Sequence, residues 1–209
     1  MTSEIKSAYL AAEGLTEPLL DELDGVIAVH DRLILSSKPF IDAHWAQNIW
    51  RTPQIVHIDS INDAAKKLKA IQRNWCLYSY QLHRRAKLIE ENLNTNQKKP
   101  IIFPSLLSPA PPGSFALLDE NTLLASTECS SPFPNGEAHF VEDKEGPPNR
   151  AYLKLYESLT LAGTRPQPGE FCIDVGGSPG GWAWVIHQCG AEVLSIDRSP
   201  LSPSVAKLQ

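Results

Sequence analysis

The sequence predicts an α/β protein in which a small α+β region precedes the start of a Rossmann-like domain. In the first 99 residues, short strand-like segments alternate with segments of helical periodicity. Residues 100–148 then hold 9 of the 17 prolines, a density that favours extended connections over long helices. Residues 171–182 run from a strand-like segment through a loop with four glycines in six positions and into a helix.

The N-terminal region is predicted to form a small antiparallel unit. Residues 7–11 are a strand candidate, and Thr16 is placed to cap a helix that continues through three leucines. Residues 26–30 and 32–35 are expected to pair as strands around a tight turn, and residues 55–58 to form the last strand. This βαββαβ-like order is similar to a ferredoxin-like unit.

Two helices are predicted after this unit. The first follows a variant of the capping box, in which Ser60 is the N-cap and Asp63 stands where Glu or Gln is usual. Apolar residues at helical spacing define the buried side of the first helix: Ala64, Leu68, Ile71 and Trp75. The same spacing defines the second helix: Leu82, Ala86, Ile89 and Leu93.

The two predicted helices carry an excess of positive charge. The whole chain has a net charge of −5, yet residues 66–99 hold nine lysines and arginines against two glutamates. A local basic face can bind nucleic-acid phosphates even when the total charge is negative. Charge alone leaves open a face that is merely solvated. The residues expected to contact RNA are Lys66, Lys67, Arg73, Arg84, Arg85 and Lys87.

Three parts are expected along the chain. Residues 1–99 form the α+β region, and residues 149–209 the beginning of the Rossmann-like domain. Between them, residues 100–148 contain three apolar segments long enough for short strands, so we expect an ordered proline-rich connection. These segments are residues 101–103, 115–118 and 122–125.

Composition indicates a cytoplasmic globular protein. No apolar run approaches the roughly 20 residues that span a bilayer, and the N-terminus lacks the apolar stretch of a signal peptide. The four cysteines show no C-x-x-C spacing, so neither a metal site nor a disulfide framework is indicated.

The glycine-rich loop is the strongest candidate for a ligand site. Ser178 stands in the middle place of the loop, which departs from the G-x-G-x-x-G pattern of dinucleotide sites. Asp174, just before the loop, would repel a pyrophosphate but suits a cation, and S-adenosyl-L-methionine carries a sulfonium and an ammonium. Asp197 lies 21 residues after Gly176, where a carboxylate can bind a ribose diol. The alternative is a plain strand–turn–helix. The residues expected to bind this cofactor are Asp174, Gly176, Ser178, Pro179, Gly180, Gly181, Trp182 and Asp197.

Two segments resemble a known family. Residues 174–182, D-V-G-G-S-P-G-G-W, resemble the D-L-G-A-x-P-G-G-W signature of FtsJ-like ribose 2′-O-methyltransferases. Residues 149–155, N-R-A-Y-L-K-L, are similar to the S-R-A-x-x-K-L segment that this family carries just upstream. Gly177 replaces the usual alanine, which we expect only to loosen the loop. The close match covers residues 149–201, and within the family it is most similar to the large-subunit rRNA methyltransferase M type, which modifies a cytidine of 23S rRNA.

The resemblance implies a catalytic role for Lys154, which family members combine with an aspartate, a second lysine and a glutamate around the target hydroxyl. These three groups would lie after Gln209, and the second predicted strand ends at Ile196. We therefore expect a fragment or a truncated gene product that is inactive alone, with rRNA as the partner of the whole protein. A non-catalytic RNA-binding protein with a relic loop is one alternative, and a small-molecule methyltransferase is another. The target nucleotide and the oligomeric state are not predicted.

Overall fold

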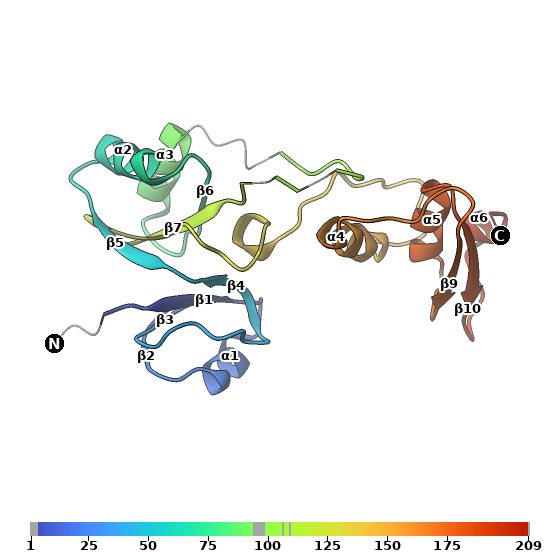
Figure 1. Cartoon of the computed structure of the whole chain (residues 1–209), viewed down its shortest axis with the longest axis horizontal. Coiled ribbons are helices and arrows are strands. Elements are labelled where there is room, and N and C mark those ends of the chain that lie inside the picture. The colour runs from blue at the N-terminus through green and yellow to red at the C-terminus, as the bar shows by residue number, and fades with distance from the viewer. Residues whose placement is uncertain (1–3, 94–98, 106, 109, 209) are drawn as a thin grey trace. The chain divides into compact units, whose positions relative to one another are not determined.

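The computed structural model describes residues 4–93, 99–105, 107, 108 and 110–208, which divide into two compact units (Figure 1). The first unit combines the described residues up to 99 with residues 108–137. The second combines residues 100–107 with the chain from residue 138 onward. The expected connection is thus divided between the two units, and its central part contributes two strands to the first.

The first sheet of the first unit has the strand order β2-β3-β1-β4, with every neighbouring pair antiparallel. Its strands are β1 (Ser7–Ala11), β2 (Val26–His30), β3 (Leu33–Ser36) and β4 (Ala46–Trp50). The helix α1 (Thr16–Glu22) joins β1 to β2, and β3 lies between these two strands. The predicted strands at 7–11 and 26–30 and the hairpin partner near 32–35 are therefore confirmed.

The expected βαββαβ order is not completed. Residues 37–45 link β3 to β4 without a helix, because Pro39 interrupts the segment and its backbone is held by side chains. Tyr9 Oη accepts a hydrogen bond from Ile41 N at 2.9 Å, and Glu22 Oε2 accepts one from His44 N at 2.7 Å. The expected N-cap at Thr16 is also wrong: Leu15 occupies that position, and no side chain caps α1.

The second sheet has the order β5-β8-β7-β6, in which β6 and β7 are parallel and the other pairs antiparallel. Its strands are β5 (Pro53–His57), β6 (Trp75–Leu77), β7 (Gly113–Asp119) and β8 (Thr122–Ser126). The strand expected at 55–58 therefore belongs to this sheet and not to the first. A short 3₁₀ turn, η1 (Pro134–Gly136), lies after β8.

Two helices cover one face of the second sheet, as the periodicity predicted. They are α2 (Ile61–Ile71) and α3 (His83–Leu93). Ser60 caps α2 by accepting a hydrogen bond from Asp63 N at 3.1 Å, which confirms the predicted cap. Trp75, however, lies on β6, and Ile71 is exposed, so neither belongs to the buried stripe of α2.

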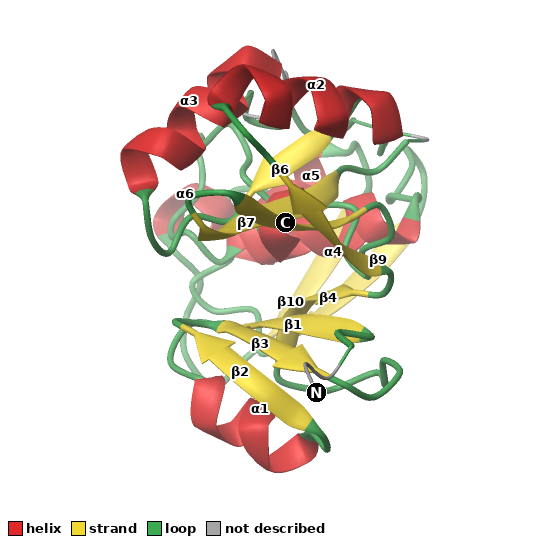
Figure 2. Cartoon of the chain, turned by 90° about the vertical axis from the view of Figure 1, so that its left-hand side faces the viewer, coloured by secondary structure: helices red, strands yellow, loops and turns green. Residues whose placement is uncertain are grey.

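The first unit is built in four layers: α1, the first sheet, the second sheet, and the α2–α3 pair (Figure 2). Buried side chains fill each of the three interfaces between these layers. Leu10 and Trp50 of the first sheet pack with Ala116 and Leu124 of the second, so both faces of both sheets contribute to the core. Within the described residues of the chain, no helix is long and apolar enough to cross a membrane.

The second unit contains a two-stranded parallel sheet covered on one face by helices. Its elements are α4 (Tyr152–Ala162), β9 (Phe171–Val175), α5 (Gly181–Gln188), β10 (Glu192–Ile196) and α6 (Pro203–Ala206). The helices and the inward side chains of the strands share one apolar cluster. Of the strand expected at 101–103, the structure shows a single bridge between Ile101 and Phe140.

The other face of this sheet is apolar and exposed. Alternate residues of each strand point to it: Phe171, Ile173 and Val175 of β9, and Leu194 and Ile196 of β10. Val175 has 78% of its surface exposed. Only one face of the sheet is therefore buried by the described residues of this unit.

Candidate functional site

The glycine-rich loop connects β9 directly to α5. Gly176 leaves the strand with φ of 79°, and Gly180 precedes the helix with φ of 111°, a backbone region that favours glycine. A β-carbon at Gly180 would lie 2.8 Å from Val205, so α6 also requires a glycine there. The strand, loop and helix predicted from the sequence are all present.

Asp197 holds the loop against the end of β10. Its Oδ2 accepts a hydrogen bond from Ser178 N at 2.9 Å, and its Oδ1 accepts one from Ser199 N at 2.8 Å. These amides, with Ser199 the larger influence, lower the pKa of Asp197. The side chain is exposed and each oxygen keeps a second lone pair. Asp197 can therefore support the loop and still accept hydrogen bonds from a ligand, and its ribose contact stays a prediction.

Asp174, at the end of β9, is only 6% exposed. Burial raises the pKa of its carboxyl, and the nearby Asp197 adds to this effect. A hydrogen bond from Ala183 N, in the first turn of α5, opposes the shift. Asp174 Oδ2 is buried and has no hydrogen-bond partner among the described residues. A buried carboxylate oxygen without a hydrogen bond lowers the stability of the fold unless a ligand donates a hydrogen bond to it.

Gly177 leaves room for this carboxylate. A β-carbon at residue 177 would lie 2.5 Å from Asp174 Oδ2 and 3.2 Å from the β-carbon of Ser195. The sequence analysis expected Gly177 only to loosen the loop, but the structure shows that this glycine also leaves room for the Asp174 carboxylate. With the loop in this conformation, an alanine would displace either the loop or the Asp174 carboxylate.

A cavity of about 160 Å³ lies beside the loop. It brings together five of the predicted cofactor residues: Asp174, Gly176, Ser178, Gly181 and Trp182. It also contains Asn149, which sequence reasoning did not assign, although the residue opens the N-R-A-Y-L-K-L segment. The other three predicted residues do not line the cavity: Pro179 and Gly180 belong to the loop, and Asp197 follows β10.

The segment before α4 is tied to the start of α5. Asn149 Oδ1 accepts a hydrogen bond from Ala151 N at 3.1 Å, and Trp182 Nε1 donates one to Ala151 O at 3.0 Å. The side-chain oxygen of Asn149 lies so close to Gly181 that a β-carbon there would clash with it. The two recognised segments thus form one wall of the same cavity.

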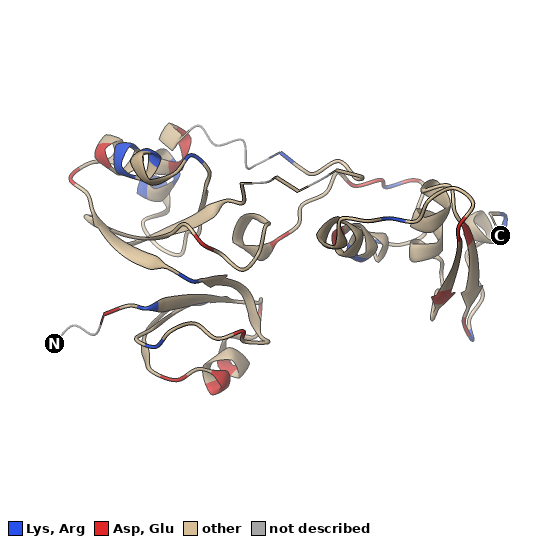
Figure 3. Ribbon diagram, in the orientation of Figure 1, with Lys and Arg blue, Asp and Glu red and all other residues tan. Residues whose placement is uncertain are grey.

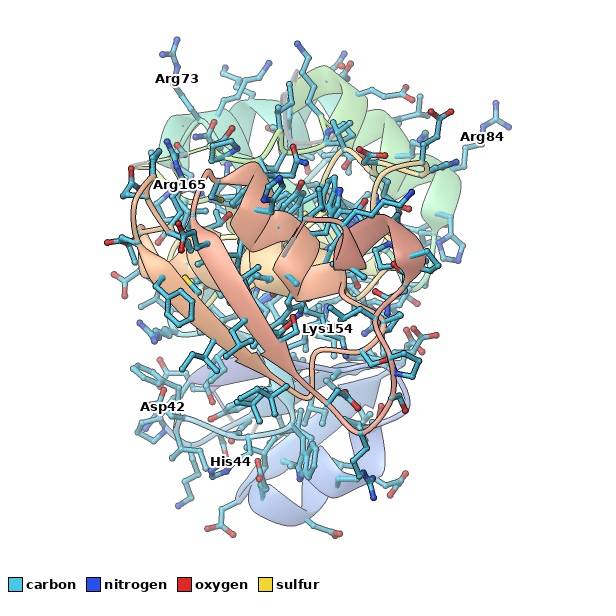
Figure 4. All side chains as sticks on the ribbon, turned by 90° about the vertical axis from the view of Figure 1, so that its right-hand side faces the viewer. Asp42, His44, Arg73, Arg84, Lys154 and Arg165 are labelled. Atoms are coloured by element: carbon cyan, nitrogen blue, oxygen red, sulfur yellow. The ribbon has the colours of Figure 1, made fainter. Side chains whose placement is uncertain are left out.

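Lys154 is exposed on α4 and is not among the residues that line this cavity (Figure 4). A larger cavity of about 590 Å³ lies elsewhere in the second unit, beside Phe103, Leu159 and Arg165. Its lining is mostly exposed and contains no carboxylate. The chemistry of a ligand site is concentrated at the smaller cavity, where Asp174 and the glycines lie.

The predicted RNA contacts lie on α2, on α3 and between them (Figure 3). Four of them are exposed and make no ion pair or side-chain hydrogen bond with another described residue: Lys66, Arg73, Arg84 and Lys87. We call these four residues the basic surface. The other two differ: Lys67 Nζ lies 2.7 Å from Asp63 Oδ2 and donates to His57 O at 2.8 Å, and Arg85 is half-buried.

The positive charges of α3 lie at its N-terminal end, which is unusual for a helix. Its first turn contains His83, Arg84 and Arg85, at the end where the helix dipole is already positive. Lys98, which contributed to the basic stretch of the sequence, lies outside the described residues. The start of α3 therefore concentrates positive potential that attracts anions such as phosphates.

Comparison with known proteins finds relatives of the second unit. Residues 147–206 match the family described as FtsJ-like methyltransferase. Several curated relatives named ribosomal RNA large subunit methyltransferase M also match the chain, which confirms the resemblance predicted from the two segments.

The relatives match over different lengths. The protein from Halorhodospira halophila is 44% identical over 62 residues, which is 28% of this chain and 18% of the relative. The one from Alkalilimnicola ehrlichii is 33% identical over 88 residues, 39% of this chain and 24% of the relative. The one from Xanthomonas oryzae pv. oryzae is 31% identical over 157 residues, 72% of this chain and 42% of the relative. The chain thus spans less than half the length of these curated relatives.

Proposed function

We propose that this protein is part of an S-adenosyl-L-methionine-dependent ribose 2′-O-methyltransferase that acts on ribosomal RNA, and on 23S rRNA in particular. The observation that carries the proposal is the cavity beside the loop, where the N-R-A-Y-L-K-L segment meets Asp174 and the glycines. The names of the relatives support rRNA as the substrate. Ribosomal RNA also implies action in the cytoplasm.

The site fits the chemistry of this cofactor. The unpaired Asp174 Oδ2 offers a hydrogen-bond acceptor to the ammonium and a negative charge that favours the sulfonium, and the side-chain amide of Asn149 offers a donor to the carboxylate. At about 160 Å³, the cavity is smaller than the roughly 300 Å³ of small pockets, so it suits only the amino-acid end. The exposed Asp197 would then receive the ribose hydroxyls. When bound, the cofactor supplies an electrophilic methyl group.

Lys154 is the proposed catalytic residue. The 2′-hydroxyl of a ribose must share or lose its proton when it attacks a methyl group, and a nearby lysine can accept that proton or orient the oxygen. An exposed position on α4 leaves the side chain accessible to an RNA substrate. The RNA itself would be bound by the basic surface of the first unit.

Cofactor binding can be tested by calorimetry with S-adenosylhomocysteine and with methylthioadenosine, which lacks the amino-acid end. Asp197→Ala should weaken both ligands about tenfold or more, because a charge-assisted hydrogen bond contributes about 1.5–3 kcal/mol. Asp197→Asn keeps one acceptor for the Ser178 or Ser199 amide and serves as the control for loop support. Asn149→Asp should weaken S-adenosylhomocysteine alone. Unchanged affinity in Asp197→Ala would contradict the assignment.

We expect these 209 residues alone to transfer no methyl group, because Lys154 is the only one of the four family groups placed within them. Tritiated cofactor and undermodified rRNA should leave the RNA unlabelled, and clear labelling would show that the catalytic groups are placed wrongly. Lys154 itself is best tested in a chimera, in which residues 1–209 replace the equivalent part of a type M relative. Lys154→Ala should then lower the single-turnover rate by about 10²–10⁴ without changing cofactor or RNA affinity.

A non-catalytic RNA-binding protein is the second candidate. It is favoured by one observation, the position of Lys154 away from the lining of the cavity. RNA binding by the first unit without any binding of S-adenosylhomocysteine would support this candidate over the enzyme.

A further inference from the structure

A surface hollow of about 460 Å³ lies in the first unit between α2 and α3, which pack side by side (Figure 2). Its lining includes five side chains from the two helices and from the residue before the α2 cap: Asp59, Asn62, Arg85, Leu88 and Asn92. Arg85 is half-buried and the other four are exposed, so a ligand can enter from solvent. The volume falls within the range of roughly 300–1,000 Å³ that is typical of small-ligand sites. The hollow is therefore large enough for a nucleobase.

The basic surface borders this hollow. Arg84 and Lys87 adjoin two of the lining residues along α3. Lys66 lies one helical turn after Asn62 on α2. Among the described residues that line the hollow, Asp59 carries the only carboxylate. An RNA strand whose phosphates are bound by the basic surface would therefore bring its bases to the hollow.

Two asparagines present a donor and an acceptor in the hollow. Asn92 Nδ2 donates a hydrogen bond to Asn62 Oδ1 at 2.9 Å, and Lys69 Nζ donates one to Asn92 O at 2.6 Å, so contacts between the helices hold the pair in place. The other two side-chain atoms, Asn62 Nδ2 and Asn92 Oδ1, have no hydrogen-bond partner among the described residues. A free donor beside a free acceptor matches the edge of a base, where an amino group lies beside a ring nitrogen.

Arg85 and Leu88 supply a surface for stacking. Arg85 Nε is buried and has no acceptor among the described residues, and the side chain makes no ion pair with any of them. Packing, and not a carboxylate, therefore holds this guanidinium. Leu88 follows on the same face of α3 and is 40% exposed. Unpaired RNA bases stack on guanidinium planes, whereas the bases of a duplex are already stacked and paired.

We propose that this hollow binds one unpaired base of the RNA and prefers a base with an exocyclic amino group beside a ring nitrogen, as in adenine and cytosine. The proposal rests on the proposed RNA binding and adds a choice of base to the phosphate contacts. Asn62 Nδ2 donates to the ring nitrogen, while Asn92 Oδ1 and the Asp59 carboxylate accept the two amino hydrogens. Uracil would turn a carbonyl oxygen toward Asp59, and two acceptors repel each other.

Fluorescence anisotropy with short labelled RNAs tests the preference. One RNA contains only uridines, and two others carry a single central adenosine or cytidine. These two should bind about fivefold or more tightly than the first, because a well-placed pair of base contacts discriminates by about that factor. Annealing each RNA to its complement should abolish the difference, since the base is then paired and cannot enter the hollow.

Variants assign the preference to the hollow. Asp59→Asn should remove it without weakening the all-uridine RNA, because an amide can donate to a carbonyl oxygen that a carboxylate repels. Asn92→Leu should also remove it, since the acceptor is lost. The matched control is Asp42→Asn, which changes the net charge equally but does not line the hollow, and its preference should be unchanged. Arg84→Ala with Lys87→Ala should weaken all three RNAs equally. Circular dichroism should show that each variant folds.

The outcomes separate this proposal from RNA binding itself. Equal affinity for the three RNAs would overturn the base preference and leave the proposed phosphate contacts standing. A preference that persists in both Asp59→Asn and Asn92→Leu would also overturn it, because another surface would then select the base. If no RNA binds, the side-chain amide signals of Asn62 and Asn92 in nuclear magnetic resonance spectra still decide. Signals that shift with adenosine and not with uridine would support the hollow while the proposed RNA binding fails, and unshifted signals would refute both.

Discussion

The two units bury their sheets differently. In the first unit each sheet is covered on both faces, because two sheets and two helical layers are stacked. In the second unit the helices cover one face of β9 and β10, and five large apolar side chains remain exposed on the other. In the first unit the candidate functional residues are thus exposed charged side chains, and they lie outside the buried core. The second holds its candidate site in a loop at the end of a half-covered sheet.

The buried polar groups of the two units differ as well. Asn48 is buried between the two sheets of the first unit, yet its side chain has hydrogen-bond partners in Ser114 and Ser131. Asp174 is similarly buried in the second unit, and one of its oxygens has none among the described residues. The hydrogen-bonded amide of Asn48 connects the two sheets, whereas the carboxylate oxygen of Asp174 that lacks a partner can accept a hydrogen bond from a ligand.

The largest expected difference between the units is the loss of folding stability when a large apolar side chain is replaced by alanine. Trp75 is fully buried and its Nε1 donates to Leu68 O at 2.8 Å, so Trp75→Ala should lower the free energy of unfolding by about 3–5 kcal/mol. Val175→Ala, on the exposed face of β9, should change it by less than about 0.5 kcal/mol. Urea denaturation followed by circular dichroism measures both.

A large loss of stability in Val175→Ala would break the comparison, because it would show that the exposed face is covered in solution. Since self-association is one way to cover it, the melt should be repeated at several protein concentrations. A concentration-independent loss would require a different account of the packing of the second unit.

Much of the architecture could be predicted because local pattern and tertiary packing agree. β1, β2 and β8–β10 have the alternation or apolar runs that the sequence shows, and the glycine loop has backbone angles that require its glycines. β4 was missed because Gln47 and Asn48 make it look polar. The side chains of Gln47 and Asn48 form hydrogen bonds with residues more than 80 positions away, Asn135 and Ser131, and no local sequence pattern reveals such partners.

The candidate site was predicted in part for the same reason. The loop residues follow from a contiguous motif, and the cavity contains most of them. Asn149 reaches the loop only through the packing of the segment before α4, so periodicity could not find it. Lys67 was counted as an RNA contact from its charge, but its amine is already bound to Asp63 and to a backbone carbonyl.

The second prediction concerns Asp174. Asp174→Asn keeps an acceptor for Ala183 N but removes the negative charge, so S-adenosylhomocysteine should bind about tenfold or more weakly, the usual loss for a charge-assisted hydrogen bond. The second unit should not become less stable at neutral pH, because a buried unpaired carboxylate is lost. Calorimetry and thermal melts measure the two effects, and a parallel loss of both would indicate a purely structural role.

The pH dependence of stability sharpens this prediction. Because the pKa of Asp174 is raised above its ordinary value of 3.8, the folded state takes up its proton before the unfolded state does. This group therefore contributes increasing stability as the pH falls from neutrality through the raised pKa. The contribution stops increasing below 3.8, where the unfolded state is protonated too. Asp197, with its lowered pKa, acts in the opposite sense, so the difference between the unchanged chain and Asp174→Asn isolates Asp174.

A smaller effect is expected for each residue of the basic surface. Arg84→Ala with Lys87→Ala should weaken RNA binding and reduce the slope of log K against log salt by about 0.7–0.9 per lost contact. Lys67→Ala is the matched control, because its amine is engaged with Asp63, and its slope should change much less. Fluorescence anisotropy with an rRNA fragment over a salt series provides the slopes. Equal slope changes for all three positions would show that the ion pair opens when RNA binds. Affinity for S-adenosylhomocysteine should be the same in each variant.

The smallest expected effect separates two hydroxyl residues that both look like helix caps in the sequence. Ser60 accepts a hydrogen bond from Asp63 N, so Ser60→Ala should lower the free energy of unfolding by about 1 kcal/mol. Thr16 is already inside α1 and makes no capping bond, so Thr16→Ala should have almost no effect. Ser60→Gly, which a cap position tolerates better than alanine, should recover most of the loss. Urea titrations of the three variants measure these differences, and an equal loss at both positions would mean that Thr16 caps its helix in solution. Both changes lie in the first unit, so cofactor affinity should not respond to either.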